Sequence, residues 1–84
     1  MITFKIIKEI ISDISGADEI SVHDKLQNDI GLDSLGLVTL LIELEERFGI
    51  ELDESDLNPF ELTTVFDVLG LVNKYMEKSN EKDG

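Results

Sequence analysis

The chain has 84 residues and no cysteine, so it predicts one small domain whose single hydrophobic core is not supplemented by disulfides or thiolate metal sites. Seven basic residues stand against 19 acidic ones, a formal net charge of -12 that disfavours nucleic acid and anionic membranes as partners and favours basic protein surfaces. No apolar run approaches the roughly 20 residues of a membrane span, and the N-terminal residues lack a signal-peptide pattern, so a cytoplasmic protein is expected.

The first helix is predicted over residues 4–14. Apolar residues recur there with a period of about 3.6, and Gly16 follows as a helix-ending residue. Residues 17–33 show no sustained period and predict a long loop. Apolar residues that can anchor this loop to the core are Ile20, Val22, Leu26, Ile30 and Leu32.

The second helix is predicted over residues 34–48, and its apolar residues form two stripes on opposite sides. The stripe expected to face the core contains Leu37, Leu40, Leu41, Leu44 and Phe48. The other stripe contains Leu35, Val38 and Ile42, and the acidic residues expected around it are Asp33, Glu43, Glu45 and Glu46. Three helices of a small domain cannot bury both stripes, so the second one predicts a partner-binding surface.

An acidic connector follows over residues 50–56, and Pro59 predicts a short helical turn through Leu62. Thr63 or Thr64 is expected to cap the last helix, in which Gly70 is expected to permit a close approach of another helix. The apolar stripe predicted for that helix contains Val65, Val68, Leu69, Val72 and Met76, with Tyr75 beside it.

The predicted fold is therefore all-α, a small four-helix bundle of three main helices and one short helix, with a long first loop. The helical domain is expected to cover residues 1–78, and the polar segment 79–84 is expected to be a flexible tail. The core is predicted to contain Phe4, Ile7, Ile11, Ile14, Leu37, Leu40, Leu44, Phe48, Val65, Leu69 and Val72.

Ser34 stands at the predicted start of the second helix, where a serine is usually a cap. Asp33 offers a competing cap, which would leave the Ser34 hydroxyl pointing outward. A nucleophilic serine needs a base, and the only histidine, His23, lies eleven residues earlier in the loop with no defined orienting carboxylate. The acidic segments do not match a calcium-binding loop, and the scattered glycines form no phosphate loop. The residues thus predict neither an enzyme nor a metal site.

Three segments carry a resemblance to a known family. Gly31-Leu32-Asp33-Ser34-Leu35 resembles the modification motif of acyl carrier proteins, including peptidyl and aminoacyl carrier proteins. Leu44-Glu45-Glu46-Arg47-Phe48-Gly49-Ile50 is similar to the end of the second helix in that family, and Thr63-Thr64-Val65 is similar to the lead into its last helix. Length, acidity and helix layout agree with the same family over nearly the whole chain.

The resemblance implies that a phosphopantetheinyl transferase esterifies Ser34 with 4′-phosphopantetheine from coenzyme A, with Asp33 and Leu35 as motif neighbours. The arm then carries an acyl or aminoacyl cargo as a thioester, so the protein would act as a shuttle and not as an enzyme. The implied partners are the transferase and the enzymes that load and process the cargo through basic docking patches. A monomer is expected.

Two positions depart from the pattern of carriers dedicated to fatty acid synthesis, which typically have acidic residues there. Gly36 follows the motif, and Thr39 lies one turn further on. These departures favour a specialised carrier for a polyketide, nonribosomal peptide, aminoacyl or D-alanyl pathway. A general carrier of fatty acid synthesis is the alternative. An unmodified acidic helical adaptor that docks basic partners would also explain the charge, although it leaves Ser34 unexplained.

Overall fold

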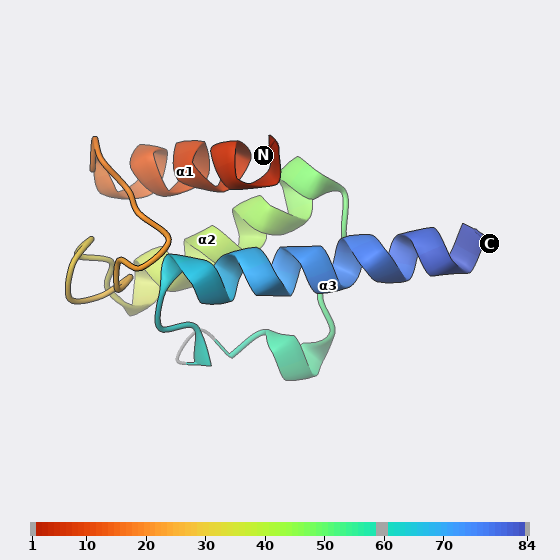
Figure 1. The fold of residues 1–84 in the computed structure, drawn as a ribbon. Helices are drawn as coiled ribbons and strands as arrows, with labels where there is room; N and C mark the ends of the chain where they lie inside the picture. The colour runs from red at the N-terminus through yellow and green to blue at the C-terminus, as the bar shows by residue number, and fades with distance from the viewer. Residues whose placement is uncertain (1, 59–60, 84) are drawn as a thin grey trace.

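The computed structural model describes residues 2–58 and 61–83, with side chains for 3–58 and 61–77. In these residues the helices are α1 (Ile2–Ser15), α2 (Ser34–Phe48), the 3-10 helix η1 (Glu54–Asp56) and α3 (Val65–Asp83) (Figure 1). The described residues contain no strand, only an isolated bridge between Lys25 and Thr64. The predicted all-α class, with three main helices and one short one, is confirmed.

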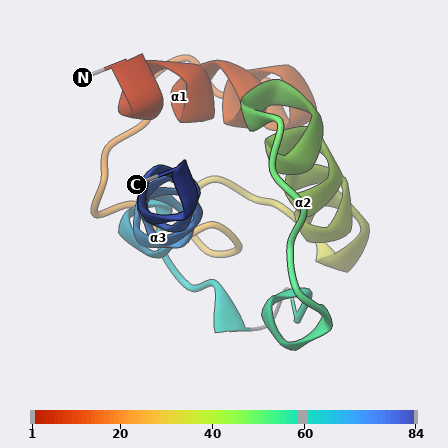
Figure 2. The same cartoon turned by 90° about the vertical axis from the view of Figure 1, so that its right-hand side faces the viewer.

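α1 packs against both α2 and α3 and lies across one side of them (Figure 2). A single core lies between the helices, and buried residues of the two long loops, Ile20, Leu26, Leu32 and Leu52, belong to it. Seven residues of the predicted core are fully buried: Ile7, Ile11, Leu37, Leu40, Leu44, Val65 and Val72. The other four, Phe4, Ile14, Phe48 and Leu69, are half-buried and pack against it. None of the helices in the described part of the chain has the length and apolar character that a membrane span requires.

The first loop is held in place by backbone pairing with the residues that open α3. The amide of Leu26 donates to the carbonyl of Thr63 (2.9 Å), and the amide of Val65 donates to the carbonyl of Asp24 (3.0 Å). Within the loop, the amide of Leu32 donates to the carbonyl of Leu26 (2.9 Å). These bonds satisfy polar backbone groups that would otherwise be costly to bury, and they fix the segment that leads into α2.

α3 begins with reciprocal capping between Thr64 and Asp67. The Thr64 hydroxyl accepts from the amide of Asp67 (3.3 Å), and the Asp67 carboxylate accepts from the amides of Thr63 and Thr64 (both 3.0 Å). This is the geometry of a capping box, with aspartate in place of glutamate. Of the two threonines proposed as caps from the sequence, Thr64 is the one whose side chain caps the helix.

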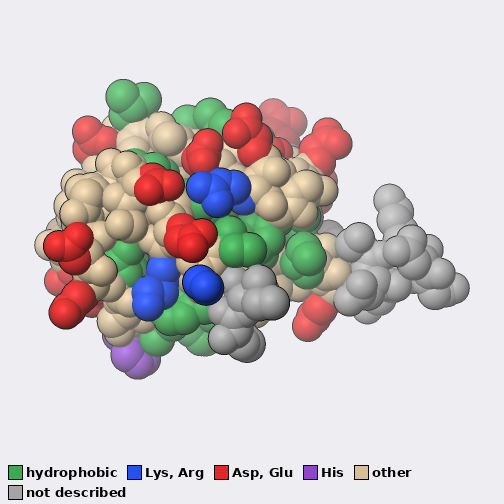
Figure 3. Space-filling view, turned by 90° about the horizontal axis from the view of Figure 1, so that it is seen from above, with side chains coloured by type: hydrophobic (Ala, Val, Ile, Leu, Met, Phe, Trp, Pro, Cys, Tyr) green, Lys and Arg blue, Asp and Glu red, His purple; other side chains and the backbone are tan. Residues whose placement is uncertain are grey.

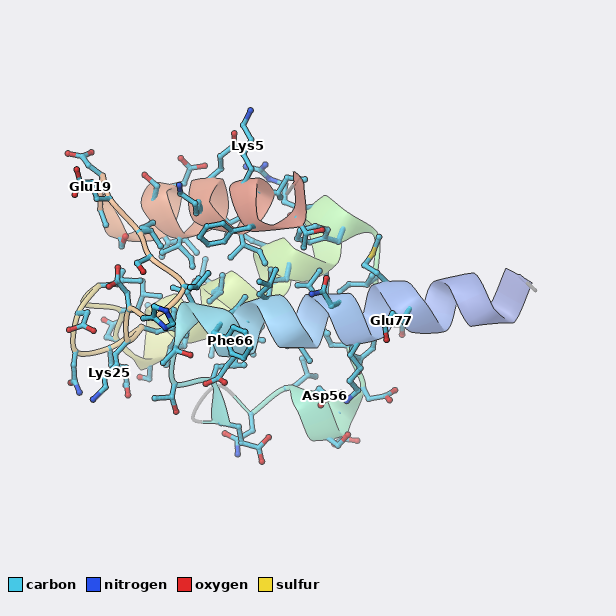
Figure 4. All side chains as sticks on the ribbon, viewed as in Figure 1. Lys5, Glu19, Lys25, Asp56, Phe66 and Glu77 are labelled. Atoms are coloured by element: carbon cyan, nitrogen blue, oxygen red, sulfur yellow. The ribbon has the colours of Figure 1, made fainter. Side chains whose placement is uncertain are left out.

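The connector between α2 and α3 is fastened to α3 through Tyr75. The Tyr75 hydroxyl accepts from the amide of Asp53 (2.8 Å) and donates to the carboxylate of Asp56, which lies beside α3 where the connector passes it (Figure 4). Lys74 forms an ion pair with the same carboxylate (3.1 Å). Burial and the hydrogen bond to Asp56 raise the pKa of the Tyr75 hydroxyl, and the hydrogen bond to Asp56 raises the pKa of Lys74.

Two expectations for α3 are wrong. Tyr75 is buried at 8% exposure whereas Met76 is 39% exposed, because Val65, Val68, Val72 and Tyr75 share the side of the helix that faces the core. Gly70 permits no close approach of a helix, since it is exposed and a Cβ atom added there would meet no atom within 4 Å.

The sequence predicted a short helical turn over residues 59–62, of which Pro59 and Phe60 lie outside the described residues. Glu61 has 3-10 conformation, and its amide donates to the carbonyl of Asn58 (3.2 Å). The 3-10 helix η1, at Glu54–Asp56, lies in the segment that the sequence indicated as an acidic connector. α3 continues to Asp83, beyond the boundary predicted at residue 78, and its C-terminal end extends past the other helices (Figure 1). The flexibility expected for residues 79–84 stays a prediction.

Candidate functional site

The start of α2 is shaped by three residues that precede it. Gly31 has a φ of 92°, a backbone conformation that glycine adopts readily, and it turns the chain toward the helix. Leu32 is then buried in the core, and Asp33 takes the extended conformation of an N-cap. The Asp33 side-chain oxygen Oδ1 accepts from the amide of Gly36 (2.7 Å), and its carbonyl accepts from the amide of Leu37 (2.9 Å). The expectation that Asp33 caps the helix is confirmed.

Ser34 is consequently the first residue of α2 and is exposed. Its hydroxyl forms no hydrogen bond with the part of the chain that the structure describes, so it is available to a reagent in solution. The helix start also favours an anion, because backbone amides of the first turn are not used within the helix and the helix dipole is positive there. An alcohol in this position can accept a phosphoryl group and hold the resulting phosphodiester in a favourable field.

The second apolar stripe of α2 faces solvent, as predicted. Leu35 is 74% exposed, Val38 42% and Ile42 50%, whereas Leu37, Leu40, Leu41 and Leu44 on the opposite side are buried. The exposed stripe starts beside Ser34 and continues for two turns along α2. Exposed apolar side chains aligned next to an exposed hydroxyl form a surface that a partner protein can cover.

The acidic residues near this stripe differ in their contacts. Glu43 lies 3.9 Å from Arg47, which also pairs with Asp13 of α1 (3.5 Å). The Glu45 carboxylate accepts from the amide of Leu52 (2.9 Å) and so holds the connector against the end of α2. Glu46 is exposed and has no ion pair or hydrogen bond from its side chain within the described residues. The sequence indicated Glu43, Glu45 and Glu46 as rim charges together with Asp33, and it missed the structural contact of Glu45.

The surface around the helices is acidic. On the face seen from the α1 side, acidic side chains are spread over the surface among a few basic ones (Figure 3). This distribution agrees with the formal net charge of -12 and favours approach by basic protein surfaces.

His23 is exposed in the first loop, and no contact between its imidazole and Ser34 is present among the described residues. The same residues include no group of three or more histidine, cysteine, aspartate or glutamate side chains arranged to hold a metal ion.

An acidic helical bundle that presents an aspartate-capped serine at the start of its second helix has the features of a domain modified with phosphopantetheine. The family model described as "Phosphopantetheine attachment site" matches residues 5–72. The chain is 40% identical over 73 residues to an acyl carrier protein of Thermotoga maritima, which covers 84% of this chain and 88% of the relative. It is 34% identical over 77 residues to an acyl carrier protein of Clostridium acetobutylicum, which covers 89% of this chain and 97% of that relative.

A further relative is the meromycolate extension acyl carrier protein of Mycobacterium tuberculosis, with 31% identity over 77 residues, 89% of this chain and 65% of that protein. The chain belongs to the acyl carrier protein family. Members of this family are carriers without catalytic activity, and their cofactor is a covalently attached 4′-phosphopantetheine. The exposed hydroxyl at a helix N-terminus fits that group, since it offers the alcohol for the ester and amides near the phosphate.

Proposed function

We propose that Ser34 is the residue to which 4′-phosphopantetheine is attached. The observation that carries this proposal is the Asp33 cap, since the bond from Oδ1 to the amide of Gly36 leaves the Ser34 hydroxyl exposed and unused. Ser34 also lies inside the segment that matches the family of attachment domains. The second negative charge, that of the Asp33 carboxylate beside the phosphate, is tolerated because the carboxylate accepts a hydrogen bond from a backbone amide at the positive end of the helix.

The attachment reaction joins Ser34 Oγ to the phosphorus atom of the pantetheine phosphate and breaks the pyrophosphate bond of coenzyme A. Adenosine 3′,5′-bisphosphate leaves with the bonding electrons, and the hydroxyl proton passes to a base that the transferase supplies. The absence of a base beside Ser34 therefore does not count against the proposal. Once attached, the group supplies a terminal thiol that holds the cargo as a thioester.

Partner enzymes are proposed to dock on the surface formed by Leu35, Val38 and Ile42, with Asp33, Glu43, Glu45 and Glu46 around it. The apolar centre would supply most of the binding energy, and the rim charges would steer basic partners toward the site. Of the three glutamates, Glu46 is the most available to pair with a basic residue of a partner. Glu43 is partly neutralised by Arg47, and Glu45 is engaged with the connector. A cytoplasmic monomer is proposed as the working form.

The pathway is proposed to be a specialised one, such as polyketide, nonribosomal peptide, aminoacyl or D-alanyl transfer. The first turn of α2 carries no acidic residue, and Thr39 in the next turn donates its hydroxyl to the carbonyl of Leu35 (2.9 Å). A partner enzyme that recognises acidic residues at positions 36 and 39 would therefore find none to contact on this chain. One relative is named meromycolate extension acyl carrier protein. The relatives at about this level of identity therefore include a carrier that is named for a particular process.

Intact-mass measurement after incubation with coenzyme A and a broad-specificity phosphopantetheinyl transferase tests the attachment site. The wild-type chain should gain the mass of one phosphopantetheinyl group, and Ser34→Ala should gain none. Ser15→Ala is a control, because its hydroxyl is bonded to the carbonyl of Ile11 (2.7 Å) and the variant should be modified normally. An unmodified wild-type chain, beside a carrier that is modified under the same conditions, would refute the carrier function.

A second experiment addresses the pathway. The modified protein is incubated with malonyl transferase and housekeeping fatty acid enzymes, and separately with adenylating enzymes, and the thioester is identified by mass. Charging by an adenylating enzyme alone would support the specialised assignment. Efficient malonyl loading followed by elongation would favour the general carrier of fatty acid synthesis.

A further inference from the structure

Gly36 lies in the first turn of α2, where the space for a side chain is already occupied. A Cβ atom added to Gly36 would lie 3.2 Å from Cδ2 of Leu32 and 3.3 Å from Oδ1 of Asp33. Favourable contacts between carbon atoms begin at about 3.5 Å, so one of these neighbours has to move to admit a side chain.

Both neighbours are held by other contacts. Leu32 is only 5% exposed, and its amide donates to the carbonyl of Leu26, which itself is fully buried. Asp33 Oδ1 is the atom that caps the helix through the amide of Gly36 (2.7 Å). A side chain at position 36 therefore requires a shift of either the last core anchor of the first loop or the carboxylate that caps the helix.

We propose that Gly36 is a positioning residue for Ser34. Because it has no side chain, Leu32 can pack against the first turn of α2 and Asp33 can cap it, which together fix the orientation of the intervening backbone and of the Ser34 hydroxyl. The inference rests on the proposed role of Ser34. It also gives a steric reason for a glycine after the motif, since even the Cβ atom of a larger residue would crowd Leu32 and Asp33.

The chain contains a matched control for this inference. Gly36 and Gly70 both lie within α-helices, and neither has a positive φ. An added Cβ at Gly70 meets no atom within 4 Å, whereas one at Gly36 meets the side chains of Leu32 and Asp33. Alanine favours a helical backbone over glycine at either position, so a difference between Gly36→Ala and Gly70→Ala reports the packing around Gly36.

Three measurements are made on each variant: the melting temperature, the hydrogen exchange rate of the amide at position 36, and kcat and KM for modification by the transferase. Gly70→Ala should melt at a higher temperature and be modified at the wild-type rate. The melting temperature of Gly36→Ala should not exceed that of the wild type, and the amide at position 36 should exchange faster. Its kcat for modification should fall about tenfold, with little change in KM. Faster exchange is expected because a shift of Asp33 Oδ1 weakens the hydrogen bond that this amide donates.

A double variant tests the contact with Leu32 directly. Leu32→Val shortens the side chain that approaches Gly36 and removes only a small part of the core volume. In the Leu32→Val background, Gly36→Ala should raise the melting temperature, as Gly70→Ala does in the wild type, because coupled neighbours give non-additive effects. An identical effect of Gly36→Ala in both backgrounds would overturn the inference.

The inference alone is overturned if the wild type is modified and Gly36→Ala matches Gly70→Ala in melting temperature and in transferase kinetics. A wild-type chain that is not modified at all would overturn the proposed function, and the positioning role with it. The melting and exchange measurements require no coenzyme A, so they distinguish a failure of the packing argument from a failure of the attachment site.

Discussion

Removing the Tyr75 hydroxyl should loosen the connector between α2 and α3 while leaving the core packed. Tyr75→Phe keeps the buried ring and deletes one oxygen atom, which accepts from the amide of Asp53 (2.8 Å) and donates to the carboxylate of Asp56. The net contribution of a hydrogen bond is about 0.5–1.5 kcal/mol, so the loss of two should lower the free energy of unfolding by about 1–3 kcal/mol. In a domain of this size each kcal/mol corresponds to roughly 4–8 °C in melting temperature.

Denaturant unfolding measures the loss, and hydrogen exchange locates it. The amide of Asp53 should exchange faster in Tyr75→Phe. The exchange rates of amides in the middle of α1 should change only as much as the change in global stability requires. Lys74→Met is the control, because it removes the half-exposed ion pair to Asp56 and leaves the hydroxyl in place. It should cost less than Tyr75→Phe, since exposed ion pairs contribute little. An unfolding free energy for Tyr75→Phe equal to that of the wild type would refute the anchoring role of the hydroxyl.

The same hydroxyl predicts a dependence of stability on pH. Burial, followed by the hydrogen bond to Asp56, raises the pKa of Tyr75 in the folded protein above its ordinary value of about 10. The unfolded chain therefore loses this proton first as the pH rises, so the stabilisation is complete below pH ~10 and is lost as the pH approaches the folded pKa. The pKa of Lys74 is also raised by Asp56, with an effect of the same sign. The alkaline loss should be smaller in Tyr75→Phe, and an unchanged alkaline profile would contradict this assignment.

Three further outcomes are expected. Leu44→Ala should lower the free energy of unfolding by about 2–5 kcal/mol, because Leu44 is fully buried, and an unchanged denaturation curve would contradict its place in the core. Val38→Asp should raise the KM of the transferase for the carrier without changing the melting temperature, and a large loss of stability would show that this side chain is needed for folding. Glu45→Ala should lower the free energy of unfolding by about 1–3 kcal/mol and speed exchange of the Leu52 amide. Glu45→Gln keeps an oxygen acceptor, so its free energy of unfolding should fall less. Equal effects of the two substitutions would contradict the contact.

The sequence predicts the bounds of α2, its cap and its exposed side closely because several local signals agree there. Asp33 is a strong cap, Gly49 ends the helix in a left-handed conformation with φ 64°, and the apolar period between them separates a buried side from an exposed one. All of these signals act within a few residues of one another. The exposure of Ser34 follows from them, since a helix with an aspartate cap needs no second cap from its first residue.

Contacts between distant residues could not be predicted in this way. Glu45 and Tyr75 are 30 positions apart, yet both hold the same connector, one through the amide of Leu52 and the other through the amide of Asp53. On a helical wheel Glu45 is simply an acidic residue beside an apolar stripe, and Tyr75 is an aromatic residue at the edge of another. Their roles depend on where the connector passes the two helices, which periodicity along a single helix does not indicate.

The motif at Ser34 likewise depends on residues far from it. Leu32 lies next to Gly36 because the first loop is anchored by Leu26, and the amide of Leu26 is bonded to the carbonyl of Thr63 at the start of α3. The orientation of the serine is therefore fixed by a path of contacts that begins at the cap of the last helix and ends at the first turn of the second. We therefore expect substitutions along this path to alter the proposed modification without changing Ser34 or the proposed docking surface. The five-residue motif points to Ser34 as the proposed attachment site, and the contacts of the loop with the last helix hold the backbone that presents its hydroxyl.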